Sequence, residues 1–311
     1  MTRAQDPLVL LAGGARDPNL HALAAALGRR GVACRRLLVG RDDHPSIRWD
    51  LDDEALTIDG EPLAPTAVFL RHDVFEGLAD PRPETAFRAA AWSTAIAGWA
   101  LSRPDVRWFN RASEQRPTNK LHALRLARAA GLEVPSTTIT NDLAALVAAA
   151  GPGVRELVAK PVAGGGPCRR VADLLPVTLT RLGRAAAPAI VQPELVPPER
   201  RLFGVRRDLT RPGQGPIDAF AFEVVSSALD YREDRGAQVL PRDPEPALVA
   251  GLHRLMDRMG LDFVAADFKA DPASGRLLFL EINNGPMFAG FDRAADGAIT
   301  TAMVAALAGH P

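Results

Sequence analysis

The chain has 311 residues, of which 47% are hydrophobic, and its 37 basic and 37 acidic residues give a formal net charge of zero. This size and apolar content predict two or three domains with sizeable cores, and the balanced charge argues against a nucleic-acid backbone or an anionic membrane as the main partner. Cys34 and Cys168, the two cysteines, are far apart and outside any metal-ligand spacing. We therefore expect neither a disulfide scaffold nor a structural zinc site, and a reducing cytoplasm as the setting.

Short apolar runs alternate with helical patterns through the first hundred residues. Strands are expected at 8–12, 36–39 and 67–70, and a helix at 19–30. Residues 50–63 contain Asp59-Gly60 and predict a small hairpin. The most apolar stretch, 87–101, predicts a buried helix that is too short to cross a bilayer. The strand–helix–strand order predicts an open α/β sheet.

The linker 111–117 is the expected boundary before a region of different character. A helix is expected over 118–131, with Thr118 as its N-cap and Gly131 as its stop. The further expected elements are strands at 136–140, 157–160 and 190–192, the last followed by a Pro-rich turn, then a helix at 245–259 and strands at 263–268 and 277–282. The turn at 271–275 is expected to pair the last two strands.

Three polar residues near the C-terminus predict a metal site. Glu281 and Asn283 stand two apart on one expected strand and so share a face, and Asp267 on the neighbouring strand can point towards them. Two carboxylates and an amide oxygen are hard ligands, which suit Mg²⁺ together with a bound phosphate. The alternative is a solvated strand face, which the apolar neighbours Phe279 and Ile282 disfavour because they indicate a buried strand.

Two of the three lysines stand where a phosphate could be bound. Lys120 opens the expected helix, and Lys160 ends a strand just before the glycine triplet formed by Gly164, Gly165 and Gly166. A strand-end lysine followed by glycines, which tolerate any φ, is typical of a phosphate-contacting loop. A solvated loop can have the same composition, so that alternative stays open. The third lysine, Lys269, is expected to be structural.

The order and spacing of these features resemble the ATP-grasp superfamily from about Asn110 to the C-terminus. The similarity is greatest to ribosomal-protein glutamate ligases and microviridin-type peptide maturases, which carry a K-P-x-x-G-x-G loop, here KPVAGGG, and a closing L-E-I-N, here LEINN. The resemblance implies an α/β (α+β) ATP-grasp fold. It places an N-terminal Rossmann-like domain at 1–112, a small lid subdomain at 113–190 and a C-terminal subdomain with the metal site at 191–311.

The resemblance also implies ATP as the nucleotide, with one or two Mg²⁺ ions and Mn²⁺ as an alternative ion. The residues that would hold the ion are Asp267, Glu281 and Asn283. Those that would contact the phosphates are Lys120, Lys160, Gly164, Gly165 and Gly166.

Further roles follow from the resemblance for the middle of the chain. The hinge around adenine would consist of Gln192, Glu194 and Leu195. Glu199 would meet the ribose. Arg201 matches the arginine of a D-x-R element in which Glu199 replaces the aspartate. Arg232, in LDYRED, is similar to an arginine that contacts the acyl phosphate or the substrate carboxylate.

Together these roles imply an ADP-forming ligase that joins an activated carboxylate to an amine or a hydroxyl. Peptide and amino-acid-like substrates both stay open, as do ring closure and the joining of two molecules. No nucleic-acid or membrane partner is expected, and a homo-oligomer is the expectation from the resemblance. Two alternatives are a kinase of the same fold and a non-catalytic nucleotide-binding module. After LEINN the chain departs from the maturases with Gly285, Pro286 and MFAGFD, so the acceptor site is expected to differ.

Overall fold

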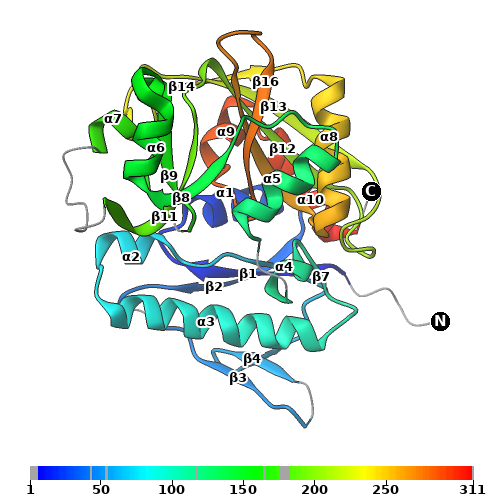
Figure 1. Ribbon diagram of the computed structural model, residues 1–311. Coiled ribbons are helices and arrows are strands. Elements are labelled where there is room, and N and C mark those ends of the chain that lie inside the picture. The colour runs from blue at the N-terminus through cyan, green and yellow to red at the C-terminus, as the bar shows by residue number, and fades with distance from the viewer. Residues whose placement is uncertain are drawn as a thin grey trace.

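The computed structural model describes residues 6–42, 44–52, 55–115, 118–163, 166–174 and 183–309. The described strands form four sheets. In Figure 1 an N-terminal α/β layer lies at the bottom, a small sheet with short helices at the upper left, and a large sheet with longer helices at the upper right. None of the helices in these ranges is long and apolar enough to cross a membrane.

The N-terminal layer is a parallel sheet, in the order β2-β1-β6-β7, with α1 above it and α3 below it in Figure 1. Its elements are β1 (Leu8–Gly14), α1 (Pro18–Arg29), β2 (Ala33–Val39), β6 (Ala67–Leu70), α3 (Pro83–Ser102) and β7 (Arg107–Trp108). Side chains alternate along β1: Val9 and Leu11 pack with α1, whereas Leu10 and Ala12 pack with α3. The predicted open α/β sheet is confirmed.

Smaller elements complete this layer: β3 (Ile47–Trp49), β4 (Leu56–Ile58), β5 (Glu61–Leu63), α2 (Phe75–Ala79) and α4 (Arg111–Gln115). The predicted hairpin is β4–β5, and β3 extends it to three strands. The buried helix predicted at 87–101 is part of α3, but it is buried on one side only. Trp99 of α3 is buried but Phe87 is 77% exposed, because the helical twist turns one side of this Ala-rich run away from the sheet.

The small sheet is antiparallel and has the strand order β10-β9-β11-β8. Its elements are β8 (Thr138–Asp142), α6 (Leu143–Ala150), η1 (Gly151–Glu156), β9 (Leu157–Pro161), β10 (Arg169–Arg170), α7 (Val171–Leu174) and β11 (Arg184–Pro193). A modest core of Val154, Ala159, Val171 and Val191 holds the short helices to the strands. Lys160 is the penultimate residue of β9, so the strand ends one residue later than predicted, at Pro161.

The large sheet is antiparallel, in the order β14-β13-β12-β15-β16. Its elements and those that pack on it are α5 (Lys120–Ala129), β12 (Val196–Arg206), β13 (Ile217–Val225), η2 (Tyr231–Glu233), β14 (Gln238–Arg242), α8 (Pro246–Met259), β15 (Phe263–Ala270), β16 (Leu277–Asn283), α9 (Ala289–Ala294) and α10 (Ala298–Ala308). Helices α5 and α8 cover one face through Leu124, Leu252 and Leu255. The turn at 271–275 pairs β15 with β16, as predicted.

The start of α5 differs from the prediction. Its N-cap is Asn119 rather than Thr118: the Asn119 side chain accepts hydrogen bonds from the backbone N–H groups of Leu121 and His122. Both residue types are good N-caps, so the sequence could not separate two adjacent candidates.

The expected Pro-rich turn after β11 is also wrong. Only Glu194 and Leu195 separate β11 from β12: Pro193 is the last residue of β11, and Pro197 and Pro198 lie inside β12. Pro197 and Pro198 fall between Val196 and Glu199, where the pairing of β12 with β15 shifts its register. A proline lacks the N–H that a regular ladder requires, so an irregular stretch at a strand end accommodates it.

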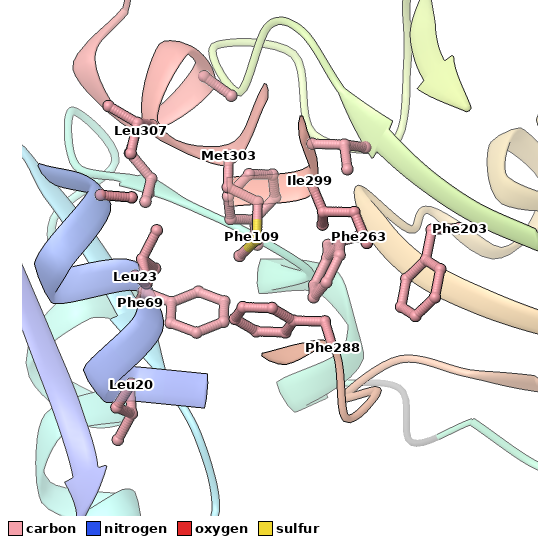
Figure 2. Packing of buried hydrophobic residues seen from close by; sticks show 14 of the residues in the cluster. Leu20, Leu23, Phe69, Phe109, Phe203, Phe263, Phe288, Ile299, Met303 and Leu307 are labelled. Carbon is pink, nitrogen blue, oxygen red and sulfur yellow. The ribbon is translucent and has the colours of Figure 1, made fainter. Parts of the chain in front are cut away.

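The N-terminal layer and the large sheet share one hydrophobic core (Figure 2). Buried side chains of β1, α1 and β6 belong to the same cluster as those of β12, β15 and α10. Phe69 of β6 contacts Phe288 edge to face, with ring centroids 6.2 Å apart. The domain boundaries expected after residues 112 and 190 fall within α4 and β11, and that division stays a prediction.

Candidate active site

The three predicted metal ligands meet on the last two strands of the large sheet. The register pairs Asp267 of β15 with Glu281 of β16. Asn283 reaches both carboxylates, with its Nδ2 3.4 Å from Asp267 Oδ2 and 3.4 Å from Glu281 Oε1. The three side chains therefore share one face, which is the arrangement that strand alternation predicts.

This donor set fits a hard divalent cation, which takes carboxylate and carbonyl oxygens. Rotating the Asn283 amide by a half turn would place its oxygen, instead of its nitrogen, beside the two carboxylates. Among the described residues no group of three or more His, Cys, Asp or Glu side chains could hold a metal ion. Asp267, Glu281 and Asn283, which include only two such side chains, stay a candidate metal site on the chemistry of their oxygen donors.

The two carboxylates lie in different electrostatic surroundings. Burial raises the pKa of Asp267 to about 7, although the guanidinium of Arg201, with its Nη1 3.2 Å from Asp267 Oδ1, opposes the rise. Burial acts on Glu281 as well, but Lys120 and Lys160 outweigh it and hold the pKa of Glu281 below its usual value. Glu281 therefore carries its negative charge firmly, and a cation bound between the two would favour ionised Asp267.

Both predicted phosphate-binding lysines lie beside Glu281. Lys120, the first residue of α5, places its Nζ 3.7 Å from Glu281 Oε2. Lys160, at the end of β9, donates to the carbonyl oxygen of Leu280 over 3.3 Å. Burial lowers the pKa of Lys160, and Glu281 opposes that change. The two lysines come from different parts of the chain and converge on one strand of the large sheet.

The glycine triplet is described only at its last member. Gly164 and Gly165 lie outside the described residues. Gly166 is exposed, and a Cβ there would stand 2.9 Å from Cγ of Pro161. A side chain at this position would therefore press on the residue that follows Lys160.

The predicted adenine hinge lies where β11 passes into β12. Gln192 is buried and donates to the hydroxyl of Thr137 over 2.9 Å, and Leu195 is buried beside it. The Glu194 carboxylate forms two hydrogen bonds with Arg170 of β10, 2.6 and 2.5 Å long. The Gln192 and Glu194 side chains are thus engaged with the small sheet, and the Glu194 N–H donates to the carbonyl oxygen of Glu156 over 2.6 Å. The other backbone groups of this connection are the candidates for an adenine edge.

Glu199 of β12 is paired with a lysine that the sequence analysis left as structural. The Lys269 Nζ lies 3.0 Å from Glu199 Oε2 and also donates to the carbonyl oxygen of Leu229 over 2.9 Å. Lys269 thus holds a predicted site residue in place. A signal existed in the sequence, because Lys269 follows Asp267 by two residues and so shares its side of the strand.

Arg201 is a buried arginine that contacts Asp267, one of the candidate metal ligands. Besides Asp267, its Nη1 donates to the hydroxyl of Tyr231 over 2.8 Å. Its Nε is buried and has no partner among the described residues. Tyr231, the one tyrosine in the sequence, was missed by the sequence analysis although it stands next to Arg232 in LDYRED.

Arg232 belongs to the short helix η2 and lies within electrostatic reach of the carboxylates. Its positive charge lowers the pKa values of Asp267 and Glu281. Hydrogen bonds to Asp230 raise its own pKa above the ordinary arginine value. The structure thus surrounds two carboxylates and an amide with four cations: Lys120, Lys160, Arg201 and Arg232. Such a site suits a polyanion bound together with a divalent cation.

The chain has matches among known structures but not among known sequences: no protein-family model and no curated protein matches it. Among solved structures, the ATP-grasp ligase PsnB complexed with a minimal precursor matches with a TM-score of 0.74 at 24% identity, over 98% of this chain and 100% of that one. The macrocyclase MdnC of Microcystis aeruginosa MRC, bound with its precursor peptide MdnA, matches with a TM-score of 0.71 at 19% identity, over 96% and 98%.

A third matching structure is a ligase whose name gives different substrates. The VanG D-Ala:D-Ser ligase of Enterococcus faecalis gives a TM-score of 0.63 at 15% identity, over 99% of both chains. The three likenesses extend over nearly the whole chain, and they show that this protein has the ATP-grasp fold that the sequence resemblance predicted.

Proposed function

We propose that this protein is an ATP- and Mg²⁺-dependent ligase that activates a carboxylate as an acyl phosphate and joins it to an amine or a hydroxyl of a peptide. The observation that supports this most directly is the ring of four cations around Asp267, Glu281 and Asn283 within an ATP-grasp fold. A peptide substrate is favoured because two of the matched proteins, PsnB and MdnC, are bound with precursor peptides.

The setting proposed for this reaction is the cytoplasm. Both cysteines, Cys34 and Cys168, are free thiols in the structure, which suits a reducing compartment. VanG, which matches less well, is a D-Ala:D-Ser ligase. Single amino acids are therefore the alternative to a peptide as the acceptor.

Phosphoryl transfer depends on positioning and on neutralising charge rather than on covalent help from the protein. Asp267, Glu281 and Asn283 would hold the Mg²⁺ ion, whose charge would offset the negative charge that develops on the phosphates. Lys120 and Lys160 supply positive charge beside Glu281. Since Lys160 sits at a strand end and donates to a strand carbonyl, its ammonium group is held in place before the nucleotide arrives.

The substrate side of the site is proposed to lie along residues 284–288, directly after the ligand strand. The N-terminal layer grips this segment: Asn110 donates to the carbonyl oxygen of Asn284 over 2.6 Å, and Arg71 to that of Pro286 over 3.0 Å. Met287, between these anchors and Phe288, is 41% exposed. A segment fixed at both ends with one exposed apolar side chain suits contact with an acceptor molecule.

The test is ADP release from purified protein with Mg-ATP, screened against pools of amino acids, small peptides and peptides encoded beside the gene. Release that depends on one pool, with a new amide or ester in the product by mass spectrometry, is the expected result. A stable phosphorylated product would instead establish the kinase alternative. Nucleotide binding without any turnover in any pool would contradict the ligase proposal.

Variants make the same assay specific to the site. We expect Glu281→Gln to raise the Mg²⁺ concentration for half-maximal ADP release by at least about tenfold, because a charged ligand is lost. Lys160→Ala should abolish turnover without unfolding the protein. Glu133→Gln is the matched control, since Glu133 lies in an exposed ion pair with Arg276, and it should behave as wild type. Wild-type rates for Glu281→Gln or Lys160→Ala would contradict the site assignment.

A further inference from the structure

One buried carboxylate outside the predicted site joins two parts of it. Asp230 is 7% exposed and lies just before η2. Its Oδ1 accepts from the backbone N–H of Arg232 over 3.1 Å and from the Arg232 Nε over 2.8 Å. Its Oδ2 accepts from the Arg232 Nη2 over 2.6 Å and from the backbone N–H of Cys168 over 3.4 Å. Both oxygens of Asp230 are therefore engaged twice.

This arrangement fixes the direction of the Arg232 guanidinium. Asp230 holds the edge formed by Nε and Nη2 in a two-point contact, which has a defined geometry. Within the described ranges, Nη1 of Arg232 has no hydrogen-bond partner, and about half of the side chain is exposed. One edge of the group is thus clamped while the other can meet an anion. Burial would raise the pKa of Asp230, but the hydrogen bonds from Arg232 outweigh it and keep the carboxyl ionised.

The bond from Cys168 comes from the segment that leads into the small sheet. Residues 167 and 168 follow the glycine triplet and directly precede β10. Next to them, Arg169 of β10 forms a two-point ion pair with Glu233 of η2, with N–O distances of 2.7 and 2.8 Å. Cys168, just before β10, and Arg169, the first residue of β10, therefore both bond to the segment 230–233 that carries Arg232.

We propose that Asp230 is a positioning residue that couples the end of the glycine-rich segment to the alignment of Arg232, with the Arg169–Glu233 pair as an outer clasp. The inference rests on the proposed ligase function, because it assigns Arg232 an anion of the reaction to bind. When residues 166–168 dock on Asp230, the carboxylate is held from both sides and Arg232 has one orientation. Binding of that segment to Asp230 and the fixed orientation of the Arg232 guanidinium therefore occur together.

Asparagine at this position separates the coupling from the packing. Asp230→Asn keeps the size of the side chain, but the amide offers one acceptor oxygen and places an NH₂ group against the guanidinium. Arg232 would then regain rotational freedom on an exposed stem. We expect kcat to fall by about 10- to 100-fold, as for misplaced catalytic groups, while the KM for ATP changes by less than about threefold.

A double-mutant cycle distinguishes positioning from a general structural effect. If Asp230 acts through Arg232, then Asp230→Asn in an Arg232→Ala background should change kcat by less than about threefold. Multiplying losses in the double variant would overturn the proposal, as would wild-type kcat in Asp230→Asn alone. Restoring the charge with Asp230→Glu should recover part of the lost kcat, whereas a merely structural role would favour the isosteric Asn.

One further measurement tests the contact between Asp230 and Cys168 when the wild type shows no turnover. Amide hydrogen exchange in residues 166–174, measured without nucleotide, should be slow at Cys168 in the wild type and about tenfold faster in Asp230→Asn. Equal exchange would overturn the tie itself, whatever the reaction is. Absence of turnover in the wild type with this exchange difference intact would contradict the proposed function instead.

The charges of the Arg169–Glu233 ion pair can be exchanged because both side chains are partly exposed. Arg169→Glu and Glu233→Arg should each lower kcat by about fivefold, and the double variant should recover most of the loss. No recovery in the double variant would remove the clasp from the proposal.

Discussion

The charge state of individual side chains in the site depends on which charged groups from other parts of the chain lie beside them. Glu281 stays ionised because Lys120 and Lys160 approach it from two distant parts of the chain. Asp267 is the more deeply buried carboxylate, and among the described residues its close cationic contact is with Arg201. Their unequal surroundings mean that the same pair of residue types responds differently to a bound cation.

Cys34 allows a pH prediction away from the site. Burial raises the pKa of its thiol to about 11, with Arg36 acting weakly in the opposite direction. Since only the thiolate reacts, we expect slow alkylation of Cys34 by iodoacetamide at pH 8, with a rate that rises about tenfold per pH unit up to about pH 11.

Peptide mapping by mass spectrometry separates Cys34 from Cys168 in this assay. The same peptide from protein unfolded in urea serves as the control and should react at the rate of a free thiol. Rapid labelling of Cys34 in the folded protein at pH 7 would show that the thiol is not buried as the structure has it.

At the scale of single elements, α5 shows how a helix start places a functional group. The Asn119 side chain caps the helix, so Lys120 occupies its first turn and points towards Glu281. In β12, the prolines at its start are accommodated by the register shift, after which regular pairing resumes at Glu199. In each case a local feature, the helix cap or the register shift, determines the position of the next functional side chain.

The cap leads to a stability prediction with a neighbouring control. Asn119→Ala should lower the free energy of unfolding by about 1 kcal/mol, because two N–H groups of α5 lose their acceptor. Thr118→Ala should change it by less than about 0.5 kcal/mol. Urea denaturation followed by circular dichroism would measure both, and equal losses for the two variants would contradict the cap assignment.

For the molecule as a whole, the shared core determines how the parts depend on one another. Helix α10, the last helix of the described residues, packs among residues of β1, α1 and β6, which lie in the N-terminal part of the chain. Figure 2 shows Met303 and Leu307 of α10 facing the same interior as Leu23, Phe69 and Phe288. The N-terminal layer therefore buries its α1 side only when the C-terminal segment is present.

This dependence predicts a global effect of a single buried residue. Met303→Ala should lower the free energy of unfolding by about 2–5 kcal/mol, the usual range for a truncated core side chain. Thr301→Ala, on the exposed side of the same helix, should stay within about 0.5 kcal/mol of wild type. Tryptophan fluorescence and circular dichroism should report one coincident transition for Met303→Ala. An N-terminal transition that Met303→Ala leaves unmoved would contradict the shared core.

How much of the site could be predicted depends on how far apart the interacting residues are in the sequence. Glu281 and Asn283 were placed together by strand alternation, and the turn at 271–275 brought Asp267 opposite to them. These relations are local, and local geometry follows from residue type and spacing. The resemblance to ATP-grasp proteins predicted the overall fold, which the matching structures show.

The sequence by itself thus determined the open α/β start, the strand pair that carries two carboxylates and an amide, and the lysine before the glycines. Only the tertiary structure decided which partners these groups have: Lys120 and Lys160 beside Glu281, Lys269 on Glu199, and Asp230 between Arg232 and Cys168. The physical reason is that backbone periodicity sets the direction of a side chain. The group it meets is set by the packing of elements that lie far apart in the chain.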